Sequence, residues 1–253
     1  ATTQTTATVP PPGGLWGLTL SNGTDATNDI DISAGTATDS GNTNAMTLSG
    51  VLTKQLDAAW AVGTNAGGLF TGANANTTYH VFLIKNPTTK VVDAGFDTSA
   101  TGANTPAGFT LKRRIGSIIR ASGAILLFSQ LMDEFLLLTS ILDVDVSNLG
   151  TSATLYTLST PGGIKTWPIM TAYSDSAAGR QLFLASPDQS DQVPSATVAP
   201  LFVIADNSST PKASAVYPGL IRTNTSSQIR ARADGINTGL TIATHGWYDR
   251  RGR

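Results

Sequence analysis

The chain has 253 residues, enough for one large β domain or two small ones. Only 13% of them are charged and the net charge is −1, so no strong electrostatic field draws the protein onto nucleic acid or an anionic membrane. The lack of cysteine excludes disulfides and thiolate metal sites, and the scarcity of Lys, Glu and Arg argues against long solvated helices.

The first 14 residues read ATTQTTATVPPPGG and show no apolar periodicity. Pro10, Pro11 and Pro12 favour an extended polyproline conformation that cannot fold on itself. Residues 1–14 are therefore interpreted as an arm that docks on another chain, with a frayed terminus as the alternative. The segment has neither a basic stretch nor an apolar core region, so no secretory signal is predicted.

Short apolar runs punctuated by Gly, Asn, Asp and Pro follow from Leu15 onward, a pattern typical of many strands joined by turns. One short helix is expected at 51–60, ended by Gly63. Its apolar stripe should dock on the sheet around Tyr79–Ile84, with a tryptophan as the buried anchor. The stripe consists of Leu52, Leu56, Ala59 and Trp60.

Two hairpins are predicted next along the chain. Strands at Thr78–Lys85 and Val91–Ala94 flank a loop of turn-forming residues. Strands at Ile115–Ile119 and Ile125–Phe128 flank a second connection, in which Gly123 can take the positive φ of a tight turn.

A long apolar stretch runs from Ala124 to Val146. Asp133 and Glu134 interrupt it, and because a charge in hydrocarbon costs roughly 3 kcal/mol, the stretch is not predicted to span a membrane. Its pattern fits either strands or an amphipathic helix, and the periodicity leaves this choice open. The apolar positions of the helical alternative are Ile125, Phe128, Met132, Phe135 and Leu142.

Strand-length segments separated by turns continue to the end of the chain. The expected fold is mainly β, an antiparallel β-sandwich or jelly-roll-like domain with one short helix. A single β-rich domain is expected over 15–253, with a possible boundary near 146–152. The later strand segments are Thr154–Leu158, Ile169–Tyr173, Gln181–Ala185, Leu201–Ile204, Gln228–Ala233 and Leu240–His245.

The two histidines, His80 and His245, each lie inside a predicted strand. Neither has a nucleophile elbow or another recognisable catalytic arrangement beside it in the sequence. Half-buried or interfacial imidazoles are therefore expected.

Carboxylates occur in pairs two residues apart, Asp29 with Asp31 and Asp143 with Asp145. Residues two apart share one face of a strand, so strand alternation explains both pairs. Neither pair has the spacing of a calcium-binding loop. A glycosidase dyad could be drawn from such residues, but no catalytic residue, cofactor or metal is predicted.

Basic residues gather in two parts of the chain. Arg113 and Arg114 follow Lys112, and Arg230 and Arg232 share one face of a predicted strand. These arginines could bind phosphate or a carboxylated sugar. Pairing with Asp or Glu across a strand or subunit contact is the favoured interpretation. The later group also includes Arg222, Arg250, Arg251 and Arg253.

The first half of the chain carries an ordered series of motifs that resembles a segment of tail-fibre-like proteins of tailed bacteriophages, over about residues 15–145. The motifs that carry this resemblance are Asn28-Asp29-Ile30-Asp31-Ile32, Met46-Thr47-Leu48, Leu56-Asp57-Ala58-Ala59-Trp60, Gly67-Gly68-Leu69, Tyr79-His80-Val81-Phe82-Leu83-Ile84, Arg113-Arg114-Ile115-Gly116-Ser117-Ile118 and Asp133-Glu134-Phe135.

One position departs from the pattern, because Met132 stands where a small turn residue is expected before the last of these motifs. Beyond residue 146 only Gly246-Trp247-Tyr248 stands out, and Trp247 is expected to belong to a closing aromatic strand. The resemblance implies a virion component and no catalytic residues.

We therefore expect a virion structural protein of the fibre, spike or tail-tip type, which attaches to the particle through its arm and contacts a host-surface glycan or receptor. A homotrimer is favoured, since fibre-type proteins often use threefold symmetry. The alternatives are a capsid decoration or head-fibre protein, a glycan depolymerase and a cellular carbohydrate-binding module. Neither a nucleic-acid partner, nor membrane insertion, nor enzymatic activity is expected.

Overall fold

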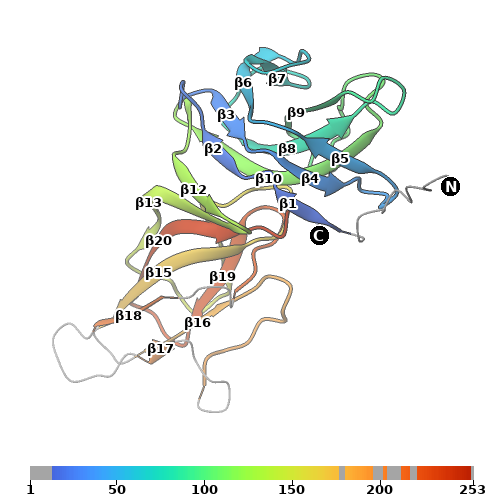
Figure 1. The fold of residues 1–253 in the computed structure, drawn as a ribbon. Helices are drawn as coiled ribbons and strands as arrows, with labels where there is room; N and C mark the ends of the chain where they lie inside the picture. The colour runs from blue at the N-terminus through green and yellow to red at the C-terminus, as the bar shows by residue number, and fades with distance from the viewer. Residues whose placement is uncertain (1–12, 177–179, 196–201, 204–211, 217–220, 252–253) are drawn as a thin grey trace. The chain divides into compact units, whose positions relative to one another are not determined.

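A computed structural model describes residues 13–176, 180–195, 202–203, 212–216 and 221–251. Within these ranges every regular element is a β-strand and none is a helix (Figure 1). The strands form several sheets, almost all of whose neighbours are antiparallel. The predicted mainly β, sandwich-like class is confirmed.

The chain forms two compact units. The first contains the described residues up to Leu126 together with Gln130–Met132, Arg250 and Arg251, and the second contains Leu127–Ser129 and the described part of Asp133–Asp249. This division differs from the single domain expected over 15–253, and the chain changes unit at 127–133 rather than near 146–152. The apolar pattern continues through 127–133 without Gly or Pro, so the sequence does not mark this boundary.

The first unit is built on an eight-stranded sheet in the order β11-β10-β8-β9-β7-β6-β3-β2 and a three-stranded sheet in the order β1-β4-β5. Its strands are β1 (Leu15–Gly17), β2 (Leu20–Asn22), β3 (Asp29–Ile32), β4 (Gly35–Thr38), β5 (Ala45–Leu48), β6 (Leu52–Ala59), β7 (Ala66–Leu69), β8 (Thr78–Lys85), β9 (Val92–Asp97), β10 (Leu111–Ala121) and β11 (Ala124–Ile125).

Strand β8 is covered on both faces. Its sequence TYHVFLIK combines β-branched and aromatic side chains, which suit a buried strand, and its six central residues are buried. Its odd-numbered face lies toward the three-stranded sheet, where Lys85 Nζ donates to the Ala45 carbonyl of β5 at 2.8 Å. On the even-numbered face, Phe82 and Ile84 form an apolar cluster with Phe109.

Both predicted hairpins are present in the first unit. β8 pairs antiparallel with β9, and the Asn86 side chain accepts hydrogen bonds from the next amides of the turn, those of Thr88 and Thr89. β10 pairs with β11 through a turn in which Ser122 and Gly123 have positive φ of 50° and 87°. The second hairpin is shorter than predicted, since β11 ends at Ile125.

The helix expected at 51–60 is wrong, because Leu52–Ala59 form strand β6. The apolar positions Leu52 and Leu56 are four apart, a spacing that fits a helix and also fits one face of a strand. Pairing with β3 on one side and β7 on the other selects the strand, a long-range effect that local periodicity does not contain. Lys54 lies between these leucines on the same buried face.

Trp60 follows β6 and packs near the predicted partner strand β8, although it does so from a loop rather than from a helix. Its indole ring contacts Phe109 and Phe70 edge-on, with centroids 5.0 and 6.4 Å apart, beside Phe82 and Ile84. The ring Nε1 donates to the Ala94 carbonyl at 3.0 Å. The structural role of Trp60 is thus retained.

A buried ion pair joins β6 to β9. Lys54 Nζ lies 3.1 Å from Asp93 Oδ1, and both side chains are fully enclosed. The same Nζ donates to the carbonyls of Ala61 and Gly63 at 2.6 and 3.1 Å, while Asp93 Oδ2 accepts from the Gly63 amide. Burial lowers the pKa of Lys54, and the Asp93 charge opposes this shift. The pair therefore fixes the loop after β6 to two strands.

The second unit is a sandwich of two sheets, in the orders β12-β13-β20-β15-β18 and β14-β19-β16-β17. Its core is made by the inward-facing residues of both sheets. Its strands are β12 (Phe128–Leu131, which begins in this unit), β13 (Glu134–Val146), β14 (Thr154–Thr157), β15 (Trp167–Ser176), β16 (Gln181–Ala185), β17 (Phe202–Val203), β18 (Lys212–Val216), β19 (Gln228–Ala233) and β20 (Thr238–Tyr248).

Two open points of the sequence are resolved at β13 and β20. The stretch 125–142 forms strands rather than a helix, and Met132 occupies the turn before β13 with φ of 55°, so the tight turn exists without a small residue. Trp247 lies in strand β20, where it is buried and stacked on Phe135 with a centroid distance of 5.5 Å.

The proposed arm falls mostly outside the described residues, which do not include Pro10, Pro11 and Pro12. Its last two residues are attached to the first unit. The Gly13 amide donates to Asn42 Oδ1 at 2.8 Å, and the Gly14 carbonyl accepts from the Thr38 amide at 2.9 Å.

Replacing Asp93 by Ala should destabilise the first unit by about 3–5 kcal/mol, because Lys54 would remain buried without its counter-charge. Urea unfolding measures the change. Asp57→Ala removes an exposed carboxylate from the same strand and serves as the control. Equal unfolding free energies for the two variants would contradict the structural role of the ion pair.

Candidate functional site

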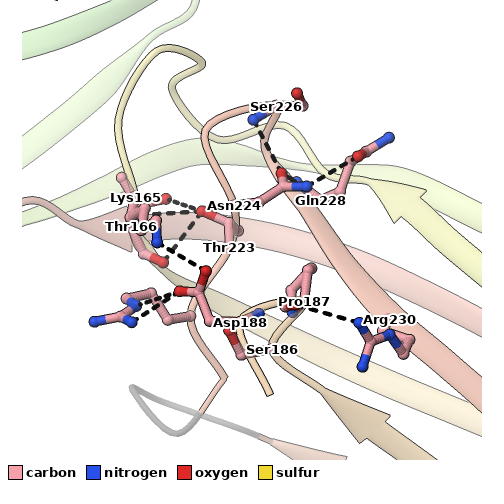
Figure 2. A network of polar contacts seen from close by, with 11 residues as sticks. Lys165, Thr166, Ser186, Pro187, Asp188, Thr223, Asn224, Ser226, Gln228 and Arg230 are labelled. Carbon is pink, nitrogen blue, oxygen red and sulfur yellow. Dashed lines mark hydrogen bonds and ion pairs between the residues drawn. The ribbon is translucent and has the colours of Figure 1, made fainter. Parts of the chain in front are cut away.

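A polar network lies at one end of the second unit, where the segment after β16 meets the residues before β15 and β19 (Figure 2). Its centre is the turn 186–189, in which the Gln189 amide donates to the Ser186 carbonyl at 3.0 Å. The Asp188 amide donates to Ser186 Oγ at 3.2 Å, so the Asp188 side chain is free to point outward from the turn.

Asp188 binds two cationic side chains at once. Lys165 Nζ donates to Oδ1 at 2.7 Å, and Arg222 donates to Oδ2 from Nη2 at 2.8 Å and from Nε at 3.2 Å. The hydrogen bonds from Lys165 and Arg222 hold the pKa of Asp188 below its usual value. The lysine and arginine side chains keep 42% and 43% of their surface exposed, so solvent still reaches both cations.

Two buried threonines, Thr166 and Thr223, hold together the two segments that carry Lys165 and Arg222. The Thr166 amide donates to Thr223 Oγ1 at 3.1 Å, and the Thr223 amide donates to the Thr166 carbonyl at 2.9 Å. Lys165 and Arg222 directly precede these buried residues, so their backbones are fixed although their side chains are not enclosed.

The turn after Arg222 is also closed by side-chain hydrogen bonds. Asn224 Oδ1 accepts hydrogen bonds from the main-chain amides of Ser226 and Gln228, both at 2.9 Å (Figure 2). The main-chain amide of Asn224 donates to the main-chain carbonyl of Gln228. The segment that carries Arg222 therefore enters β19 with a defined geometry.

An open hollow of about 200 Å³ lies against this network. It is lined by Trp167, Ser186, Asp188, Gln189 and Arg222, and we call it the Trp167 pocket. A second hollow of about 280 Å³ shares one lining residue with it; the residues there are Phe183, Gln189, Ser190 and Gln192. Each hollow thus combines one aromatic ring with several polar side chains.

Arg230 and Arg232 fasten the segment that forms these hollows. Arg230 donates to the carbonyls of Gln189 and Pro187 at 2.7 and 3.2 Å, and Arg232 forms an ion pair with Asp191. Arg232 thus pairs with a carboxylate of the segment after β16, whereas Arg230 binds main-chain oxygens. Both arginines extend from one face of β19, as the alternation predicted.

Arg113, Arg114 and Arg251 have structural positions in the first unit, and Arg253 lies outside the described residues. Arg113 and Arg114 are buried in β10, where Arg114 Nη1 donates to Ser117 Oγ at 3.0 Å. Arg251 is buried too, and its guanidinium donates to the carbonyls of Ile115 and Leu18 at 2.8 and 2.7 Å. The basic cluster around Arg113 is therefore not an exposed binding surface.

The two histidines and Asp143 take part in internal contacts. His80 is fully buried with Nδ1 2.9 Å from Ser117 Oγ, and the half-buried His245 places Nε2 3.0 Å from Thr171 Oγ1. Asp143 accepts hydrogen bonds from Ser159 and Thr244, which joins β13 to its neighbours.

In the described part of the chain, no group of three or more His, Cys, Asp or Glu residues is arranged to hold a metal ion. No helix suited to crossing a membrane occurs there either.

The sequence did not reveal most of the Trp167 pocket. The sequence marks Arg222 as one of a group of basic residues and gives no comparable signal for Lys165, Trp167 or Asp188. The one local signal was Ser186-Pro187-Asp188, a run of turn formers directly after a strand. Such a run predicts a turn and does not indicate which side chains face it.

No protein-family model, no curated protein and no solved structure matches this chain.

Asp188 should titrate below the ordinary pKa of an aspartate, because both cations favour its ionised form. The ion pairs should persist above that lowered pKa and disappear as the pH falls through it. A carbon-13 NMR titration of the side-chain carboxyl measures this. Arg222→Gln should raise the pKa, whereas Arg222→Lys should retain much of the shift; equal values in all three proteins would contradict the described network.

Proposed function

We propose that this protein is a bacteriophage virion structural protein of the fibre, spike or tail-tip type, and that it contacts saccharides of the host surface through the Trp167 pocket. The observation that carries the proposal is the combination, in one open hollow, of a partly exposed indole with Asp188, Gln189 and Arg222. The all-β scaffold and the motif series of residues 15–145 support the assignment to a phage particle.

The chemistry of the pocket suits a sugar ring. An aromatic face binds the apolar C–H surface of a pyranose, while amide, carboxylate and guanidinium groups bind its hydroxyls in defined directions. The Trp167 pocket offers all of these groups, and the buried threonine pair and the 186–189 turn fix their main chains. Ordering before binding lowers the entropic cost of association.

Assembly of the particle would use other parts of the chain. Residues 1–14 are proposed to dock on another virion protein, since proline reduces the entropy lost when such a segment becomes ordered. Self-association, with a homotrimer as the favoured form, is proposed to bury the outward side of β13. Leu136, Leu138 and Leu142 are exposed there, and single exposed leucines are common whereas three on one strand are not.

Replacing Trp167 by Ala should weaken saccharide binding by at least about fivefold, because loss of an aromatic contact in a binding centre commonly costs more than about 1 kcal/mol. The effect is measured by the binding of the purified 253-residue chain to an array of bacterial surface glycans. Trp16→Ala is the matched control, since Trp16 lies in β1 and is 56% exposed. Identical binding by all three proteins would remove the pocket from the proposal.

Labelling of intact particles tests the virion assignment itself. Label at the tail tip or fibres supports it, whereas label on the capsid favours a decoration or head-fibre protein. Release of reducing sugar from a bound polysaccharide would favour the depolymerase alternative, and a gene without virion neighbours would favour a cellular carbohydrate-binding module.

The double variant Leu138→Ser, Leu142→Ser should shift the protein toward monomer, because it removes the two most exposed leucine side chains of β13. Light scattering after size-exclusion chromatography measures the mass. Val62→Ser, at an exposed apolar position of the first unit, should leave the mass unchanged. A monomeric wild-type chain, or an oligomer that tolerates the double variant, would contradict this interface.

A further inference from the structure

The polar end of the second unit carries an excess of positive charge. Lys165 and Arg222 share the single carboxylate of Asp188, and Arg230 is held by main-chain carbonyls rather than by an acid. Arg232 is balanced by Asp191. Among the described residues of this network, four cations therefore face two carboxylates, a surplus of two positive charges in a chain whose net charge is −1.

Asp188 uses only some of the hydrogen-bond donors of Lys165 and Arg222. Of the three ammonium hydrogens of Lys165, one is used on Oδ1, and Arg222 uses Nε and Nη2 on Oδ2. The hydrogen bonds that Arg222 donates to Asp188 come from Nε and Nη2 and do not use Nη1. A guanidinium fork and an ammonium group side by side can therefore accept a second oxyanion.

The cations are also reachable. Their side chains are 42% and 43% exposed, so an incoming anion displaces water and does not require the protein to open. Asp188 lies on a turn whose closure depends on Ser186 and Gln189 rather than on the Asp188 carboxylate. The carboxylate can move away from Arg222 while the turn stays closed.

We propose that the Trp167 pocket selects an anionic saccharide, whose carboxylate or phosphate group binds Arg222 and Lys165 in partial exchange for Asp188. The sugar ring lies against Trp167, and Gln189 binds its hydroxyls. This inference rests on the proposed function and adds the ligand class. Asp188 acts as an internal substitute for the ligand's acid group, and it keeps the two cations apart from solvent anions when the pocket is empty.

Three probes separate the possible ligands: an oligogalacturonate for the carboxylate, a glycerol-phosphate polymer for the phosphate, and a neutral galacto-oligosaccharide of matched length. Isothermal titration of the full chain should give at least about tenfold tighter binding of one acidic probe than of the neutral one, since hydrogen bonds to charged partners are the stronger ones. The preference should decrease as salt is added, because the cations are exposed.

Two variants at the pocket should act in opposite directions. Arg222→Gln should weaken binding of the acidic probe by about tenfold or more and leave the neutral probe little changed. Asp188→Asn should strengthen binding of the acidic probe, because the competing carboxylate is gone. Arg250→Gln is the control for Arg222→Gln, because it removes one positive charge at an exposed position of the first unit. It should leave the binding of all three probes unchanged.

The outcomes distinguish the inference from the proposed function. Equal binding of acidic and neutral probes overturns the anionic preference and leaves saccharide binding intact. Loss of acidic-probe binding in Asp188→Asn, with an unchanged circular dichroism spectrum, makes Asp188 a direct ligand contact and overturns the exchange. Tighter binding of a single-stranded oligonucleotide than of any saccharide overturns the ligand class, and a failure of all glycans, neutral and acidic, overturns the proposed function.

Discussion

The second unit depends on the pairing of β20 with β13 on one side and β15 on the other. β20 is the central strand of its sheet and comes almost last in the chain, so residues separated by about a hundred positions must meet before this sheet exists. The Trp167 pocket depends on the same pairing, because Trp167 opens β15 opposite Tyr248 of β20. Tyr248 is held in turn by its hydrogen bond to Glu134 of β13.

Local alternation was enough to predict strands wherever two faces of a segment differ in polarity. Gln181–Ala185 and Gln228–Ala233 were predicted with the bounds that the structure has. Every second residue of Gln228–Ala233 is buried, and Gln181–Ala185 follows the same alternation up to Leu184. The segment 51–60 failed because Leu52 and Leu56 satisfy both periods, and the choice was made by the partners β3 and β7. Strand order and the change of unit at 127–133 also depend on such distant pairings, which no local pattern encodes.

The pocket was harder to predict than the strands, for a related reason. Lys165, Asp188 and Arg222 come from three separate connections, and only the packing of the two sheets brings them together. The buried pair Thr166 and Thr223 fixes their meeting, and a threonine between polar neighbours looks the same in a sequence whether it is buried or exposed. What the sequence could show was that arginines collect toward the C-terminal part of the chain, and this was the observation closest to the site.

Several of the few charged residues of this chain stabilise loops or bind buried protein oxygens. The exposed cations at the Trp167 pocket differ from these residues. Asp97 accepts hydrogen bonds from Ser99 and Asn104, and Asp39 accepts them from Gly41 and Thr43, so each carboxylate closes a loop that glycine-rich sequence would leave loose. Lys54, Arg114 and Arg251 are likewise buried against protein oxygens. In a protein that encloses cations in this way, Lys165 and Arg222 differ by sharing one acid at the edge of an open hollow. Exposed ion pairs contribute little to stability, and an arrangement of this kind agrees with the proposed recognition of an anionic partner.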